Sequence, residues 1–146
     1  MTVDRPQSDD VAASEAYRYP SSSNSDLIGP PHFITCYEKY PYLFQQQGAS
    51  SIPDRLMDVR IPVVEYWKCV LSYATVLTDN MFCAGNFFLG GQGTCQGDSG
   101  GAAVQDGQAV GIVSFGRGCG QPLSPSVFAD IAAPEIRDFI TKHTGL

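Results

Sequence analysis

The pattern of apolar and polar positions along the chain predicts a domain built mainly of short strands. Residues 56–64 are rich in apolar and β-branched types, which favours a strand, and Pro62 confines this stretch to a sheet edge or a strand end. Two further apolar runs, 102–105 and 108–115, flank an Asp-Gly pair at 106–107. Because both residues of such a pair tolerate positive φ, the pattern predicts a hairpin with a two-residue turn.

Two segments have helical character instead. Residues 65–74 could hold a short helical turn, and Pro134 suits the first position of a second helix. Three apolar residues of this second segment fall on one face at i, i+3, i+4 spacing: Ile136, Phe139 and Ile140. The sequence therefore predicts a short closing helix docked on a sheet.

The first third of the chain differs from the rest. Residues 1–31 contain four prolines and a serine-rich run. Such a segment buries too little apolar surface to offset the entropy lost when it is ordered, so we expect an irregular or disordered leader. Seven aromatic or aliphatic residues crowd into 32–44, which indicates one buried strand or loop in preference to an aromatic ligand box. A polar connector follows. We accordingly divide the chain into a leader (1–31), an aromatic segment with its connector (32–52) and a β-domain (53–146).

Composition supports an all-β domain and excludes two partner classes. The 146 residues include 15 glycines and 10 prolines but only 16% charged residues, a balance typical of tight turns between strands. The net charge of -6 and the lack of a Lys/Arg cluster exclude a nucleic-acid partner, because phosphate binding needs clustered positive charge. No apolar window is long enough to span a membrane.

Cysteine spacing favours disulfides over a metal site. The five cysteines are Cys36, Cys69, Cys83, Cys95 and Cys119. Their spacing matches no zinc pattern of paired C-x-x-C elements, so no metal and no other cofactor is expected. Disulfides predict an oxidising compartment, with one thiol left over. The first 14 residues, however, lack the apolar region of a secretory signal.

The run at 93–101, Gly-Thr-Cys-Gln-Gly-Asp-Ser-Gly-Gly, carries the most specific signal. Taken alone, its Gly-Asp-Ser-Gly-Gly core could be a tight turn without chemistry. Further blocks at 80–85, 111–116 and 125–128 occur in the same order as in one protease family. On these blocks the sequence resembles the chymotrypsin-like serine proteases, in particular the C-terminal barrel of insect digestive-type members.

The resemblance implies a fold and a set of catalytic roles. The fold is most of one Greek-key β-barrel of the two-barrel family architecture, with a short C-terminal helix. Ser99 stands at the nucleophile position, and the backbone N–H groups of Gly97 and Ser99 stand at the oxyanion hole. Asp98 matches the carboxylate that pairs with the ammonium freed by activation cleavage. The chain has no Ile-Val-Gly-Gly segment to supply that ammonium, so we expect Asp98 to be solvated or to have a substitute partner, and the oxyanion hole to stay in a zymogen-like, unformed state.

The resemblance also locates a substrate pocket and two disulfides. The pocket floor is Gly93, and the wall residues that bind substrate are Thr94, Gln96, Ser114, Phe115, Gly116 and Ser126. An uncharged floor disfavours Lys and Arg side chains, which would be desolvated without compensation, so the expected substrates are apolar, in a slot that Ser126 narrows. The implied disulfides are Cys69–Cys83 and Cys95–Cys119, with Cys36 as the odd thiol.

No histidine of this sequence matches the family's general base in its sequence surroundings. The two histidines, His32 and His143, both lack the family's Ala-Ala-His-Cys surroundings, and Asp26 shows only a faint match to the family's Asp-Ile-Ala-Leu strand. We therefore expect a secreted serine endopeptidase by family whose isolated chain is an inactive fragment. Its partners would be a peptide or protein substrate, a protease inhibitor, or a complementing barrel bearing His and Asp. The alternative is a non-catalytic module that binds peptides or an inhibitor.

Overall fold

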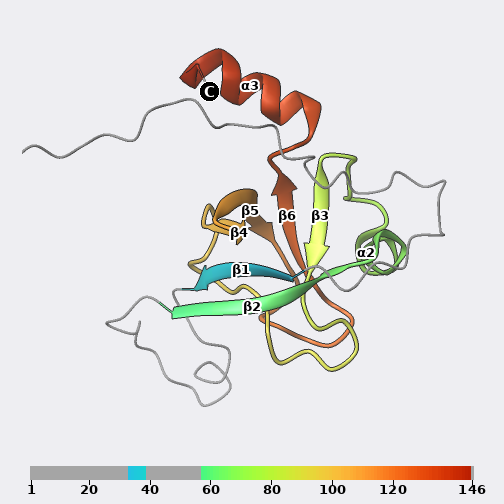
Figure 1. Cartoon of the computed structure of the whole chain (residues 1–146). Helices are drawn as coiled ribbons and strands as arrows, with labels where there is room; N and C mark the ends of the chain where they lie inside the picture. The colour runs from blue at the N-terminus through green and yellow to red at the C-terminus, as the bar shows by residue number, and fades with distance from the viewer. Residues whose placement is uncertain (1–32, 39–56, 146) are drawn as a thin grey trace, which may run out of the picture.

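A computed structural model describes residues 33–38 and 57–145, in which six antiparallel strands form a closed barrel (Figure 1). The strand order around the barrel is β1-β2-β3-β6-β5-β4. The strands are β1 (Phe33–Glu38), β2 (Met57–Val64), β3 (Met81–Ala84), β4 (Ala102–Gln105), β5 (Gln108–Phe115) and β6 (Ser126–Asp130). Two helices accompany them, α2 (Tyr66–Tyr73) and α3 (Pro134–Thr144). The predicted all-β fold with a short C-terminal helix is confirmed.

Strand β1 closes the barrel. It pairs with β2 from Phe33↔Pro62 to Glu38↔Met57, and its residues Thr35 and Cys36 pair with β4. The strand lies within the aromatic segment 32–44, so the barrel includes residues on the N-terminal side of the 53–146 domain drawn from sequence. The leader 1–31 and the connector lie outside the described residues.

Pro62 marks the point where β2 changes partner. Residues 57–62 pair with β1, whereas Val63 and Val64 pair with β3. The carbonyl of Pro62 accepts a hydrogen bond from the N–H of Gly85 at 2.9 Å. Pro62 thus ends one ladder, where the missing N–H costs least, and β2 is not an edge strand because the barrel is closed.

The hairpin between β4 and β5 forms as predicted. Asp106 and Gly107 have φ of 50° and 79°, and the flanking residues Gln105 and Gln108 are paired. These left-handed conformations suit the right-handed twist of the two strands. The hairpin brings β5 alongside β4, which begins directly after the Ser99 motif.

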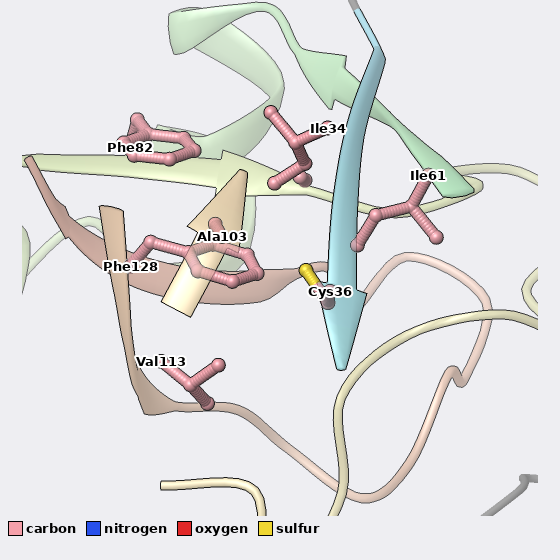
Figure 2. Packing of buried hydrophobic residues seen from close by; sticks show 8 residues of the cluster. Ile34, Cys36, Ile61, Phe82, Ala103, Val113 and Phe128 are labelled. Atoms are coloured by element: carbon pink, nitrogen blue, oxygen red, sulfur yellow. The ribbon is translucent and has the colours of Figure 1, made fainter. Parts of the chain in front are cut away.

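The barrel core is a cluster of inward-facing side chains from all six strands (Figure 2). The Phe82 and Phe128 rings stack with centroids 5.1 Å apart. A Cβ at Gly111 would lie 2.6 Å from the Phe82 ring, so only glycine lets β5 pass this ring so closely. Cys36 is fully buried in the cluster and takes part in neither disulfide.

The closing helix α3 forms where predicted, but the expectation that it docks on a sheet is wrong within the described residues. Pro134 occupies its first turn, and Gly145 ends it in the left-handed conformation. None of its residues is buried, and Phe139 is 64% exposed. Figure 1 shows the helix leading away from the end of β6. Apolar residues at helical spacing predict that a helix forms. They do not predict which other surface, if any, covers its apolar face. No helix in the described ranges has the length and apolarity to cross a bilayer.

Candidate active site

The loop that carries Ser99 is fastened at both ends. On its N-terminal side, the N–H of Asp98 donates to the carbonyl of Cys95 at 3.1 Å. On its C-terminal side, the N–H of Gly100 donates to the carbonyl of Val113 at 2.9 Å, which attaches the loop to β5. Ser99 itself is exposed between these two attachments. The sequence therefore presents a serine hydroxyl to solvent on a fixed turn.

Two backbone donors in this loop are not used by the fold. The N–H groups of Asp98, Gly100 and Gly101 all have backbone acceptors. Within the ranges that the structure describes, the N–H groups of Gly97 and Ser99 have no hydrogen-bond partner. Gly97 adopts φ of 98°, a conformation that a residue with Cβ rarely takes. These are the two donors that the family resemblance implies for an oxyanion hole.

The carboxylate of Asp98 is turned into the protein. The residue is only 3% exposed, and its Oδ2 accepts the N–H of Cys95 at 2.7 Å. Of the two alternatives expected from sequence, the structure has the substitute partner. This bond closes the turn from residue 95 to 98.

Two disulfides anchor the neighbourhood of the loop. Cys95 is bonded to Cys119, with Cα atoms 4.7 Å apart, which ties the Ser99 loop to the segment before β6. Cys69 is bonded to Cys83, with Cα atoms 5.8 Å apart, which ties α2 to β3. This is the pairing that the family resemblance implies.

The base of the expected pocket is tight. Gly93 and Thr94 are buried, and the N–H of Thr94 donates to Ser126 Oγ at 2.9 Å. A Cβ built on Gly93 would lie 3.1 Å from the Cα of Gly120 and 3.2 Å from Ser126 Oγ. The Ser126 hydroxyl thus joins two segments of the pocket and occupies space next to its floor.

The remaining wall residues lie nearer the surface. Gln96 and Ser114 are exposed, and Phe115 is half-buried. The pairing of β5 with β6 shifts register between Val113 and Phe115, so Ser114 sits in an irregularity of the strand. A Cβ on Gly116 would lie 3.8 Å from the Cα of Ser126, an ordinary van der Waals contact, so the position could hold a small side chain without a clash.

Tyr73 is a site residue that the sequence reasoning missed. Its hydroxyl donates to the carbonyl of Pro125 at 2.8 Å and accepts the N–H of Arg117 at 3.2 Å. Its ring meets that of Phe115 edge to face at 5.6 Å. One buried tyrosine therefore holds both wall segments, those after β5 and before β6. The available signal was its position four residues after Cys69, which places it on the anchored face of α2.

A hollow of about 410 Å³ opens beside this tyrosine, lined by Tyr73, Val76, Phe115 and Arg117. The Arg117 guanidinium lies 5.2 Å from the centroid of the Tyr73 ring. Phe115 belongs both to this hollow and to the expected pocket wall. The lining of the hollow is mainly apolar.

The candidate bases are not brought to the serine by the described residues. His143 is exposed on α3, where its Nδ1 lies 2.7 Å from the carbonyl oxygen of Phe139. Its ring packs on that of Phe139, with centroids 4.3 Å apart. His32 and Asp26 lie outside the described residues.

The loop, the disulfides and the barrel agree with the outcome of a family comparison. The family model described as Trypsin matches residues 13–140. The chain belongs to the trypsin family. The resemblance identified from the sequence begins at Pro53, and the family match begins forty residues earlier. The match therefore includes strand β1.

Individual relatives support the same assignment. The mite protein Trypsin Blo t 3 of Blomia tropicalis is 46% identical over 87 residues, which are 58% of this chain and 33% of the relative. A trypsin of the insect Phaedon cochleariae is 44% identical over 92 residues, 62% of this chain and 35% of the relative. The chain thus spans about a third of the length of the curated trypsins it matches.

A solved structure extends the likeness to the fold. Neuropsin, a serine protease of mouse brain, matches with a TM-score of 0.65 and 29% identity over 77% of this chain and 48% of that chain. This trypsin-family barrel therefore corresponds to about half of a known serine protease structure.

Proposed function

We propose that this barrel is the nucleophile half of a serine endopeptidase site, with Ser99 attacking the substrate carbonyl. The observation that carries the proposal is the geometry of one loop. Ser99 is exposed, and the adjacent N–H groups of Asp98 and Gly100 are bonded within the barrel, whereas those of Gly97 and Ser99 have no partner among the residues that the structure describes. Two unused donors beside a hydroxyl suit the oxyanion that forms when the hydroxyl attacks an amide.

The proton of Ser99 needs a base that the described residues do not place beside it. His143 is exposed on α3, and neither histidine has the surroundings of the family's catalytic histidine. The base and its orienting carboxylate would come from a second barrel, in the same or another polypeptide. Without a triad base, the oxyanion donors and substrate binding retain only about a thousandfold advantage over water. The barrel alone is therefore inactive as a peptidase.

The substrate class follows from the pocket. Gly93 brings no charge to the floor, and the Ser126 hydroxyl is already bonded to Thr94 N–H. A buried ammonium or guanidinium would find no compensating charge from these residues. An uncharged, apolar residue before the cleaved bond is the preferred substrate, unlike the Lys or Arg that an aspartate at the floor selects in trypsin-like members.

A fluorophosphonate probe tests the proposal, because its labelling requires an activated serine. The isolated barrel should label no faster than its Ser99→Ala variant. Addition of a His- and Asp-bearing barrel of the family should produce labelling that the Ser99→Ala variant lacks, together with cleavage after apolar residues. Labelling that is absent even in the reconstituted complex, or a preference for Lys or Arg, would contradict the assigned roles.

One observation favours a second function, a non-catalytic module that binds a peptide or a protease inhibitor. The open hollow beside Tyr73 can hold an apolar side chain without any chemistry at Ser99. Two results together would support this function. The affinity for an apolar peptide would be equal in the wild type and in Ser99→Ala, and the fluorophosphonate probe would not label Ser99 even after addition of the second barrel. In either case the two disulfides point to an oxidising, extracellular compartment.

A further inference from the structure

Exposed apolar side chains gather on one side of the barrel, around α2. Nine large apolar residues are exposed in the described ranges, and five of them lie on α2, in the turn after β3 or in the loop before β6. These five are Trp67, Leu71, Phe88, Leu89 and Leu123, and we refer to them as the α2 patch. The patch does not include Ser99 or any residue assigned to the substrate pocket.

Contacts between the three segments make the patch continuous. The Lys68 ammonium lies 5.2 Å from the centroid of the Trp67 ring and 5.4 Å from that of Phe88, so it joins the helix to the turn after β3. The N–H of Leu123 donates to the carbonyl of Phe87 at 2.7 Å. Ser72 Oγ of α2 donates to the carbonyl of Leu123 at 2.8 Å, which connects α2 to the loop before β6.

The α2 patch is large for the surface of a monomer. Its members are 55–79% exposed. For side chains of this size, such fractions amount to roughly 600 Å² of apolar surface, at the upper limit for a typical monomer. A stable dimer buries about 800 Å² on each partner, so the patch with a polar rim would suffice.

The charge balance of the patch favours a second copy of this chain as its partner. Lys68, which lies against the Trp67 and Phe88 rings, forms a salt bridge of 2.7 Å with Glu65, so these two charges cancel. The chain as a whole carries -6, which makes two copies repel through most of their surfaces. A neutral apolar patch can face its own copy without that repulsion. It also offers no excess positive charge for an anionic membrane.

We propose that two copies of this chain associate through the α2 patch about a two-fold axis. In such an isologous interface each patch covers the other, and the rings of Trp67 and Phe88 provide the central apolar anchors. The Lys68–Glu65 pair is satisfied within each copy and needs no charge from the partner. The proposal is independent of catalysis, because Ser99 lies outside the interface.

Two matched variants test the surface by sedimentation velocity over a range of concentrations. Phe88 and Phe139 are 65% and 64% exposed, but only Phe88 belongs to the patch. We expect the wild type to dimerise, Phe88→Asp to raise the dissociation constant at least about tenfold, and Phe139→Asp to leave it unchanged. A monomer at every concentration, equal effects of the two variants, or an effect of Phe139→Asp alone would overturn the proposal.

A third variant, Glu65→Lys, tests the role of charge and covers the case in which Phe88→Asp unfolds. It converts the neutral pair into two positive charges, so the facing patches repel. We expect a weaker dimer at low salt and recovery at high salt, since screening reduces the repulsion. The near-UV circular dichroism should match that of the wild type. A dissociation constant that Glu65→Lys leaves unchanged at low salt would contradict the interface.

Discussion

The two helices of this protein have similar apolar periodicity but different relations to the barrel. Helix α2 buries Cys69, Ser72 and Tyr73, whereas α3 buries none of its residues. Helix α2 is the more apolar of the two, and specific attachments also fix it to the barrel. A disulfide fixes α2 to β3, and the Tyr73 hydroxyl reaches across to Pro125. For helix α3, no comparable disulfide or long-range side-chain hydrogen bond is found among residues 33–38 and 57–145, and its Phe139 ring packs on His143 of the same helix.

The comparison shows why only one of the helices shapes the candidate site. The Tyr73 hydroxyl bonds to Pro125 just before β6 and to Arg117 just after β5, next to residues expected to line the pocket. Changes in α2 should therefore reach the pocket, while changes in α3 should affect little beyond the helix itself. The variants that follow test this contrast.

The largest effect should come from removal of the disulfide that anchors α2. Cys69 and Cys83 are separated by 14 residues, and a loop of about that length gives roughly 3 kcal/mol in the chain-entropy model. We expect Cys69→Ala/Cys83→Ala to lower the free energy of unfolding by about this amount in urea titrations under oxidising conditions. The wild type with both disulfides formed, measured under the same oxidising conditions, serves as the reference. A loss below about 1 kcal/mol would mean that packing alone holds α2.

A smaller effect should follow from Tyr73→Phe, which removes only the hydroxyl. The buried carbonyl of Pro125 loses its donor and the N–H of Arg117 loses its acceptor, at a cost of about 1–2 kcal/mol. Amide exchange of Arg117 should become faster, because its hydrogen bond is lost. Unchanged exchange of this amide would show that the tyrosine does not hold the wall.

The same contrast explains which features could be predicted from sequence. The Asp-Gly hairpin depends on the φ preferences of two adjacent residues, so it could be predicted. The Ser99 loop could be located because its chemistry resides in one contiguous motif. The bond from Tyr73 to Pro125 spans 52 residues, and the uncovered face of α3 depends on what surface lies nearby. Neither is encoded in local spacing, and both had to come from the tertiary structure.

Helix α3 should tolerate substitution of its most exposed ring. Phe139 is 64% exposed, so Phe139→Ala removes little buried surface, and alanine favours the helix. We expect a change in the free energy of unfolding within about 0.5 kcal/mol. The matched control is Phe82→Ala in the barrel core, where the ring is only 7% exposed and the expected loss is about 3–5 kcal/mol. A loss above about 2 kcal/mol in Phe139→Ala would show that the apolar face of α3 is covered in solution.

The smallest effect concerns Asp130, which lies at the end of β6 where the chain turns towards α3. Burial raises the pKa of this carboxyl above its ordinary value, although hydrogen bonds from the backbone of Ala132 and Ala133 act in the opposite direction. Because the folded state disfavours the ionised form, the fold loses stability as the pH rises from the ordinary pKa, about 4, through the raised one.

Asparagine carries no charge and keeps an oxygen that can accept the N–H of Ala132, which lies 2.9 Å from Asp130 Oδ1. We therefore expect Asp130→Asn to have a slightly higher melting temperature than the wild type at pH 7 and an equal one near pH 3. Asp106→Asn, at the exposed hairpin tip, alters the net charge equally and serves as the control. A melting temperature of Asp130→Asn that is lower at pH 7 and again equal near pH 3 would mean that the ionised carboxylate stabilises the turn into α3.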